Sequence, residues 1–459
     1  MIRIENAGVP DGKGQRELEL YLHIPFCVRK CKYCDFLSAP ADAQVQNAYM
    51  EALRREVQES ADKAWVPMAE KADGADKAWV PMAQKADGAD METVISPGQC
   101  EVTSIYIGGG TPSVVNPAWI TRLMTCIREC YSVAEQAEIT LEINPGTVTR
   151  ESLLQYKQTG INRLSIGCQS TDDGELARIG RIHTFAQFLD AYRWAREAGF
   201  ANVNVDLMNA LPGQEMADVE RNLERLLMIS PRPEHISVYS LIVEEETPFY
   251  QMWEKGELAV GAMRLPDEEL EREMYWRTAE YLKAQGYEHY EISNFALPGC
   301  ESRHNCGYWE RRDYLGFGLG AASLYGGMRF SNTRDLREYM AIWSGTQGER
   351  IKAQGKRLED RGREQIEQLS VQDEMEETMF LGLRMAKGVS VYRFREQFGC
   401  ELEEVYGAEL EESIREGLME KKVGAGADRD ARYVLTARGV DVSNYVMAKF
   451  LQNQDGAGK

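Results

Sequence analysis

Three cysteines close to the start of the chain form the group of residues best suited to chemistry. Cys27, Cys31 and Cys34 have the spacing C-x3-C-x2-C. Thiolates are soft ligands that suit iron–sulfur clusters, and three on one loop can hold three irons of a 4Fe–4S cluster, leaving the fourth iron open to a small chelating molecule. A four-cysteine zinc site needs a second pair, and none follows at zinc spacing. The alternative, three structural cysteines, is disfavoured because free cysteines usually scatter through a core.

The elements that must position these cysteines alternate along the chain. A short apolar strand, Leu18–Ile24, leads into the cysteine loop. Further on, strands alternate with helices, which indicates a parallel sheet covered by crossover helices. The expected strands are 102–107, 138–143, 163–166, 202–207 and 235–241, and the helices between them are 123–130, 152–159, 185–198 and 219–228. Polar or glycine-rich segments follow the strands, at the carboxyl ends where α/β folds carry their sites.

Several strand-end residues have side chains or backbone suited to a charged small ligand. The run Gly108-Gly-Gly-Thr-Pro lets backbone amides approach a ligand that a Cβ would exclude, although a bare tight turn is an alternative. The carboxylate of Glu142 can accept a hydrogen bond from an ammonium group or a hydroxyl. The alternative is that Glu142 is a solvated residue at the edge of the sheet. Gln169 and Asp206 suit ribose hydroxyls, and Arg181 can meet a carboxylate as a bidentate fork, with Arg178 as a local competitor.

Composition narrows the class of protein. The chain has 459 residues, ten cysteines and a formal net charge of −20. This charge argues against non-specific binding to nucleic acids or anionic membranes. No apolar run reaches the roughly 18 residues that span a membrane. Residues 1–6 lack a signal-peptide apolar region, and the cysteines fit a reducing compartment, so we expect a cytoplasmic protein without a transmembrane segment.

The cysteine loop resembles the radical S-adenosylmethionine (SAM) enzymes, whose signature is C-x3-C-x-aromatic-C, with Tyr33 as the aromatic residue here. In that family the open iron chelates SAM. The preceding Tyr21-x-His23-Ile-Pro-Phe narrows the resemblance to the branch of oxygen-independent coproporphyrinogen oxidases and their heme-chaperone relatives. The resemblance implies an α/β fold, an incomplete (β/α)6 radical SAM barrel with a small C-terminal winged-helix-like domain.

The same resemblance implies which residues hold the cofactors. The cluster ligands are the three cysteines, and the family places the SAM arginine two residues before a histidine, which selects Arg181 over Arg178. His23 is expected to play a supporting role beside the cluster. The implied SAM-side residues are Tyr21, Tyr33, Gly109, Gly110, Thr111, Glu142, Gln169, Arg181 and Asp206.

Two positions distinguish the members of this branch. The oxidases carry a fourth cysteine two residues after the third, and Phe36 stands there in this chain. Downstream, His304-Asn-Cys-Gly-Tyr-Trp309 matches H-N-x-x-Y-W, a motif of the heme chaperones. A histidine is a proper axial ligand for heme iron, and Tyr308 and Trp309 offer flat faces to a macrocycle. His304 is thus a candidate heme ligand; a hydrogen-bonded structural histidine, or ligation by Cys300 or Cys306, is the alternative.

We therefore predict a heme chaperone that binds a 4Fe–4S cluster, SAM and heme and passes heme to client hemoproteins. In this interpretation the cluster and SAM serve heme transfer or homodimer formation, without coproporphyrinogen oxidase activity. The alternative is an oxygen-independent coproporphyrinogen III oxidase, which converts two propionates to vinyl groups. A radical SAM enzyme that uses H-N-x-x-Y-W to stack another substrate is a third class.

The chain divides into a barrel, an extension and a C-terminal domain. Residues 61–74 recur almost unchanged as 75–88, and two copies are too few for a solenoid. We interpret the repeat as a partly disordered surface insertion; Trp65 and Trp79 leave a binding module as the alternative. The expected order is a lead-in at 1–16, the partial barrel at 17–244 with its 61–88 insertion, an extension at 245–344 that contains the histidine motif, a linker at 345–371 and the C-terminal domain at 372–459.

Overall fold

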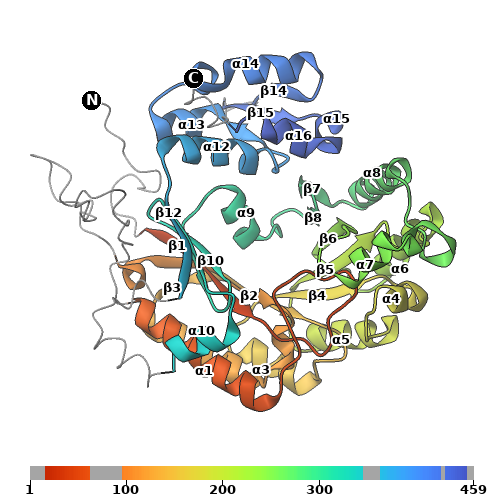
Figure 1. The fold of residues 1–459 in the computed structure, drawn as a ribbon, viewed down its shortest axis with the longest axis vertical. Helices are drawn as coiled ribbons and strands as arrows, with labels where there is room; N and C mark the ends of the chain where they lie inside the picture. The colour runs from red at the N-terminus through yellow and green to blue at the C-terminus, as the bar shows by residue number, and fades with distance from the viewer. Residues whose placement is uncertain (1–15, 62–95, 345–361, 425–429, 452–459) are drawn as a thin grey trace, which may run out of the picture. The chain divides into compact units, whose positions relative to one another are not determined.

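The structure is a computed structural model that describes residues 16–61, 96–344, 362–424 and 430–451 (Figure 1). Most of the predicted lead-in, the repeat insertion after Ala61 with its two tryptophans, and linker residues 345–361 lie outside these ranges. The described residues belong to two compact units. The barrel unit comprises 16–285 and 313–368, and the helical unit comprises 286–312 and 369–451. The histidine motif therefore groups with the C-terminal residues rather than with the rest of 245–344.

Six strands of the barrel unit pair in parallel and in chain order, so the predicted parallel sheet is confirmed. They are β1 (Glu17–Ile24), β2 (Glu101–Gly109), β3 (Ser132–Ile143), β4 (Arg163–Gln169), β5 (Asn202–Asn209) and β6 (His235–Ser240). The connecting helices are α1 (Ala43–Ala61), α2 (Pro117–Cys130), α3 (Arg150–Gln158), α4 (Asp173–Arg178), α5 (Phe185–Glu197) and α6 (Met216–Leu227). In Figure 1, α1, α3 and α5 lie on the same side of the strands.

The strands alternate apolar and polar residues, which explains both the packing and the position of the site. Val203 and Val205 of β5 are fully buried apolar residues that alternate with Asn204 and Asp206. Parallel strands covered on both faces usually read as continuous hydrophobic runs. Here only one face packs against the helices. On the other face polar side chains of neighbouring strands bond to one another, as when Asn204 Nδ2 donates to Ser165 Oγ at 2.8 Å. The inner face of this sheet is therefore polar.

The helices begin at side-chain caps soon after the strand ends. Thr149 caps α3, Asp172 caps α4 and Thr184 caps α5, each accepting a hydrogen bond from a backbone N–H of the first turn. Such caps satisfy backbone groups that the helix itself leaves unpaired. Because each helix starts at a fixed residue, the short loop between strand and cap has little freedom. The strand-end residues are held in place on both sides.

Four further strands extend the sheet beyond β1. β9 (Tyr314–Phe317) pairs in parallel with β1, and β10 (Ala322–Tyr325), β11 (Met328–Asn332) and β12 (Arg363–Gln368) follow in antiparallel order. β12 lies within the range 345–371 that was expected to be a linker, so residues 363–368 of that range form a strand. Its residues, Arg-Glu-Gln-Ile-Glu-Gln, are almost all exposed and polar. An exposed edge strand carries no apolar alternation, and the sequence pattern therefore gave no sign of it.

A buried carboxyl group joins α1 to this extension. Glu56 of α1 accepts hydrogen bonds from Gly318 N–H at 2.8 Å, Asn332 Nδ2 at 2.7 Å and Tyr339 Oη at 2.6 Å. Tyr339 lies on α10 (Leu336–Ile342). Burial raises the pKa of Glu56 to about 7, against the lowering effect of these donors. Every one of its partners comes from a distant part of the chain, so this group fixes the extension to the barrel.

The helical unit contains the predicted C-terminal domain. Its helices are α9 (Arg303–Trp309), α12 (Val371–Gly382), α13 (Val391–Phe398), α14 (Leu402–Arg415), α15 (Ala437–Asp441) and α16 (Ser443–Ala448). β13 (Val389–Ser390), β15 (Ala431–Leu435) and β14 (Met419–Val423) form an antiparallel sheet in that order, and β7 (Glu288–Glu291) pairs with β8 (Asn294–Ala296). Val442, whose backbone is not helical, separates α15 from α16.

After β6 the barrel unit continues with α7 (Pro248–Glu254) and α8 (Glu268–Ala284). None of the helices in the described part of the chain combines the length and apolar character needed to cross a bilayer.

Candidate cofactor site at the strand ends

The loop with the three cysteines follows β1 and is fixed by backbone hydrogen bonds to two other loops. Lys32 N–H donates to Ile179 O at 3.1 Å, and Lys32 O accepts from Phe249 N–H at 3.0 Å. Arg29 Nη2 donates to Gly180 O at 2.9 Å. The turn after α4 and the start of α7 therefore hold the centre of the loop, between its second and third cysteines.

The three cysteines offer the donors that an iron–sulfur cluster needs. All are free thiols; Cys27 is buried, while Cys31 and Cys34 are partly exposed. Burial raises the pKa of the Cys27 and Cys34 thiols. Within the described ranges no three His, Cys, Asp or Glu side chains are arranged as a complete set of metal ligands, this loop included. The fit to a cluster thus rests on the type of donor and on their common loop.

Two glycines at the end of β2 allow that strand to touch the start of the cysteine loop. Gly109 has φ +113°, and a Cβ there would lie 2.8 Å from the ring of His23. A Cβ on Gly110 would lie 2.6 Å from Phe26 O. Real Cβ atoms do not approach other atoms this closely, so larger residues would push the loop away. The glycine run predicted to bring backbone amides close to a ligand does approach the cysteine loop.

A short relay on β1 fixes the orientation of His23. His23 Nε2 lies 2.9 Å from Leu37 O, and because a carbonyl only accepts, Nε2 carries the proton. His23 Nδ1 then accepts from Tyr21 Oη at 2.9 Å. Burial lowers the pKa of His23, which keeps this ring neutral. Tyr21 and His23 thereby connect the inner face of the sheet to the far end of the cysteine loop.

Two predicted carboxylates lie on the inner face of the strands. Glu142 accepts from Tyr106 Oη at 2.8 Å and from Gly109 N–H at 3.2 Å. Burial raises the pKa of Glu142 to about 7, and the nearby Asp206 contributes to this rise. Asp206 accepts from Asn204 Nδ2 at 2.7 Å, and burial raises its pKa as well. Two neighbouring carboxylates with elevated pKa values favour a cationic or hydrogen-bond-donating ligand.

Gln169 and Arg181 lie beside the next strand end. Gln169 has φ +67°, a conformation that non-glycine residues seldom adopt, and its buried Oε1 has no hydrogen-bond partner within the described ranges. A buried polar atom without a partner is costly, and a bound ligand can satisfy it. Arg181 donates to Gly167 O at 2.8 Å and to Cys31 Sγ at 3.8 Å. Arg181 is therefore the arginine that reaches the cysteine loop, as expected over Arg178.

Asn144 was not predicted as a site residue, although it is hydrogen-bonded to two residues that were, Thr111 and Arg181. Its Nδ2 donates to Thr111 Oγ1 at 2.7 Å, and its Oδ1 accepts from Arg181 Nη2. It follows Glu142 in the Asn144-Pro-Gly turn, so its position at a strand end was the available signal. Tyr33 packs against the apolar cluster around Leu176, and burial raises the pKa of its phenol. The strand ends thus bring together every predicted SAM-side residue of the barrel unit.

The histidine motif lies in the helical unit and is closed. His304 on α9 is 1% exposed, and its Nε2 lies 3.0 Å from Tyr308 Oη, with the two rings in a T-shaped contact at 4.7 Å. Trp309 lies 4.3 Å below the guanidinium of Arg384. Cys300 and Cys306, both partly buried, pack in the same small core. The predicted heme ligand is therefore a buried, hydrogen-bonded side chain.

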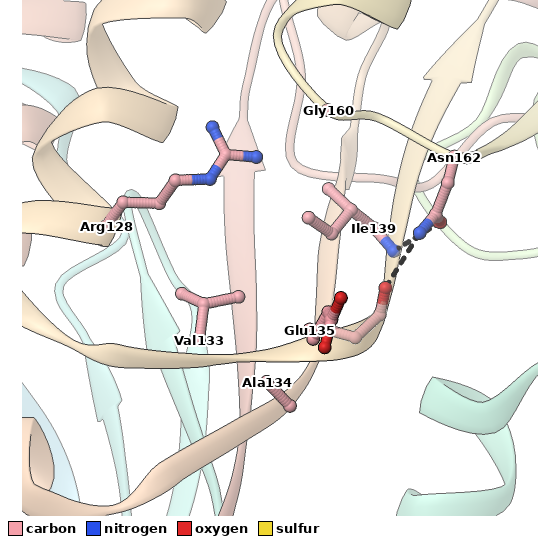
Figure 2. A pocket seen from close by; sticks show the side chains of 8 residues that line it. Arg128, Val133, Ala134, Glu135, Ile139, Gly160 and Asn162 are labelled. Carbon is pink, nitrogen blue, oxygen red and sulfur yellow. Dashed lines mark hydrogen bonds between the residues drawn. The ribbon is translucent and has the colours of Figure 1, made fainter.

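A surface cavity of about 430 Å³ lies at the other end of the strands, near the start of β3 (Figure 2). Asn162 closes one wall by donating to Ala137 O and accepting from Ile139 N–H, both at 2.8 Å. Arg128 and Glu135 also line it. None of the predicted site residues does, so this cavity is separate from the candidate cofactor site.

The comparisons with known proteins agree with this architecture. The profile of the Radical SAM superfamily matches residues 92–226, and the profile of the HemN C-terminal domain matches residues 369–442. Coproporphyrinogen III oxidase (HemN) from Escherichia coli has a similar structure, with a TM-score of 0.71 at 21% identity over 95% of this chain and 90% of that one. The chain is a radical SAM protein with a HemN-type C-terminal domain, and the predicted incomplete (β/α)6 barrel is confirmed.

The similarity to curated proteins identifies the family within this class. Heme chaperone HemW from Lactococcus lactis is 34% identical over 437 residues, which cover 95% of this chain and 98% of that protein. Heme chaperone HemW from Bacillus subtilis is 34% identical over 432 residues, covering 94% and 98%. The chain belongs to the heme chaperone HemW family. The radical SAM profile begins after the cysteine loop, so the role of the three cysteines depends on their own pattern.

Proposed function

We propose that this protein is a cytoplasmic heme chaperone that binds a 4Fe–4S cluster, SAM and heme and transfers heme to client hemoproteins, with homodimer formation as part of the cycle. The observation that carries this proposal is the near full-length similarity to heme chaperone HemW from two organisms. Phe36, 63% exposed, supports it, because the oxidases of the branch have a fourth cysteine at this position.

In this proposal the cluster is held by Cys27, Cys31 and Cys34, and its open iron supplies a chelation point for the amino and carboxylate groups of SAM. The protein's own contribution is to bind and orient SAM. Gly109 and Gly110 keep the space for a close backbone approach, and the unpaired Oε1 of Gln169 is an acceptor for a hydroxyl. The other proposed contacts are Tyr21, Tyr33, Thr111, Glu142, Arg181 and Asp206.

We propose the H-N-x-x-Y-W segment as the heme region, with His304 as the axial ligand. His304 is buried and bonded to Tyr308, so ligation requires that this contact be broken and that α9 expose the imidazole. Cys300 and Cys306, which pack in one small core with Trp309, are the alternative ligands. Flat aromatic faces in the segment support contact with a macrocycle.

The test is a paired assay on anaerobically reconstituted protein. We expect a heme Soret band on titration with heme, transfer of that heme to an apo-hemoprotein, and no protoporphyrinogen from coproporphyrinogen with SAM and a reductant. Turnover of coproporphyrinogen would favour the oxidase alternative. If His304→Ala binds heme as the wild type does, the ligand assignment is wrong while the chaperone proposal stands.

A further inference from the structure

Arg163, the first residue of β4, is a buried cation with unusually few partners. Its side chain is 2% exposed. Nη1 donates only a long hydrogen bond, 3.5 Å, to Thr140 Oγ1, and Nε has no partner within the described ranges. In the same ranges it forms no ion pair with a carboxylate. Burying an uncompensated charge costs several kcal/mol, so an arginine in this state needs a source of negative potential nearby.

That negative potential comes from the candidate SAM site. Arg163 and Ser165 lie on the same face of β4, and Ser165 Oγ donates to both oxygens of Asp206 at 3.4 Å. Thr140, the hydrogen-bond partner of Arg163, lies two residues before Glu142 on the same face of β3. Arg163 therefore lies on the inner face of the sheet, next to the side chains that support both carboxylates.

We propose that Arg163 is a positioning residue for SAM: its guanidinium supplies the positive charge that allows Glu142 and Asp206 to share the inner face of the barrel as carboxylates. The inference rests on the proposed SAM site and goes beyond it, because within the described ranges no hydrogen bond or ion pair joins Arg163 to the cysteines or to the proposed SAM contacts. Its influence is electrostatic. Arg163 lowers the pKa of both carboxyl groups, which burial raises.

The other groups that face the two carboxylates cannot replace this charge. Burial raises the pKa of the phenols and of the Cys168 thiol, so they are neutral near pH 7, and burial lowers the pKa of His235. In the described part of the chain Arg181 is the other cation that lowers the pKa of Asp206, and it is already bonded to Asn144 and Gly167. These groups are Tyr21 from β1, Tyr33 from the cysteine loop, Tyr106 from β2, Cys168 from β4, His235 from β6 and Arg181 after α4.

The first experiment measures SAM binding by equilibrium dialysis on reconstituted protein between about pH 6 and pH 9. Loss of the positive charge in Arg163→Gln raises the pKa of both carboxyl groups, so the carboxylates form only at higher pH. We expect the midpoint of SAM binding to move up by about one pH unit, with affinity roughly fivefold weaker at pH 7. Arg163→Lys keeps the charge and should keep the wild-type midpoint. Arg128→Gln, at the remote cavity, is the matched arginine control.

The second experiment does not depend on SAM. At a pH high enough to ionise both groups without Arg163, the two buried carboxylates repel each other, so there the double variant Arg163→Gln/Asp206→Asn should have a higher Tm than Arg163→Gln alone. Additive destabilisation in this cycle, or an unchanged pH midpoint in Arg163→Gln, would overturn the inference. If the wild type itself binds no SAM, the proposed SAM site is wrong, and the stability cycle still decides whether Arg163 balances the two carboxylates.

Discussion

The strand-end site of the barrel unit and the histidine motif of the helical unit differ in how far the side chains proposed to bind a cofactor are already satisfied. Within the described ranges Gln169 Oε1 at the strand ends has no hydrogen-bond partner, and two carboxylates there have raised pKa values. In the histidine motif the candidate ligand His304 is buried and bonded to Tyr308, although Trp309 Nε1, which lies under Arg384, has no hydrogen-bond partner in those ranges either. The first arrangement is prepared for a ligand. The second is a closed core that must rearrange before a metal can reach the imidazole.

This difference has a physical consequence for each proposed cofactor. A preformed polar site loses little free energy in reorganisation when its ligand binds. A closed site binds only through its open form, so its apparent affinity is reduced by the fraction of molecules that are open. SAM binding should therefore respond mainly to changes in contacts, and heme binding mainly to changes that open α9.

The largest effect is expected from removing a proposed cluster ligand at the strand-end site of the barrel unit. Cys31→Ala should abolish the bound iron and the broad absorbance of the cluster, because the two remaining thiols of the loop cannot replace it. Iron and sulfide analysis after anaerobic reconstitution measures this. Cys400→Ala, a partly exposed cysteine of the helical unit, is the control and should retain the cluster. If Cys31→Ala keeps its full iron content, the assignment of the cysteine loop as the cluster site is wrong.

The next effect concerns the close approach of β2 to the cysteine loop. In Gly110→Ala the new methyl group would lie 2.6 Å from Phe26 O, so the loop must move. We expect SAM binding to fall at least tenfold and stability to fall by about 1–3 kcal/mol. Gly407→Ala in α14 is the control, since nothing lies within 4 Å of its added Cβ. If the two variants behave alike in dialysis and thermal unfolding, the close approach of β2 to the cysteine loop does not matter for SAM binding or stability, and this prediction is wrong.

Glu56 is a buried carboxyl group of the barrel unit whose hydrogen bonds are satisfied. It therefore tests whether the difference between the two sites comes from the unit in which a group lies or from its hydrogen bonding. Glu56 is fully partnered, and its pKa rises to about 7 in the folded state from an ordinary value of 4.5. An acid with a raised folded pKa stabilises the fold less as pH rises through this window. The wild type should therefore lose about 2 kcal/mol of stability from this group between about pH 5.5 and pH 8.

Glu56→Gln tests this group because an amide does not titrate. It should be less stable than the wild type at low pH, where its NH2 meets other donors, and the gap should narrow as pH rises. Denaturant unfolding at the two pH values measures both effects. A gap that is constant with pH would show that Glu56 does not titrate in this range, so that its pKa in the folded state is not raised as expected.

The sequence predicted the barrel well because its strands and strand ends have local signals. Alternation in β5 and the glycine run after β2 are visible in a few consecutive residues, and the parallel sheet was confirmed. The roles given to Glu142 and Gln169 stay predictions, although the fold brings them to one edge. Arg163 could not be found in this way, because its importance depends on which side chains of neighbouring strands surround it.

The helical unit was harder to predict for a different reason. The motif at His304 signalled a family, but a motif does not reveal whether its histidine is exposed or buried. That property depends on how the side chain packs in the fold, where His304 is 1% exposed and bonded to Tyr308. Likewise β12 has no apolar pattern, since its residues lie at an exposed edge. The spacing of apolar residues shows which side chains face a core. It does not show an exposed edge strand such as β12 or whether a motif histidine is buried.

The smallest effect is expected when the histidine motif of the helical unit is loosened while His304, its candidate heme ligand, is kept. Tyr308→Phe deletes the hydroxyl that holds His304 Nε2 at 3.0 Å and leaves the aromatic face in place. A hydrogen bond of this kind contributes about 1 kcal/mol, so the open form becomes more populated and heme affinity should rise about fivefold. Soret titration of the wild type, Tyr308→Phe and His304→Ala measures the change, and Tyr445→Phe, an exposed tyrosine of the same unit, controls for general loosening. If Tyr308→Phe weakens heme binding, Tyr308 contacts heme itself, and the helical unit would then resemble the strand ends in being prepared for its ligand.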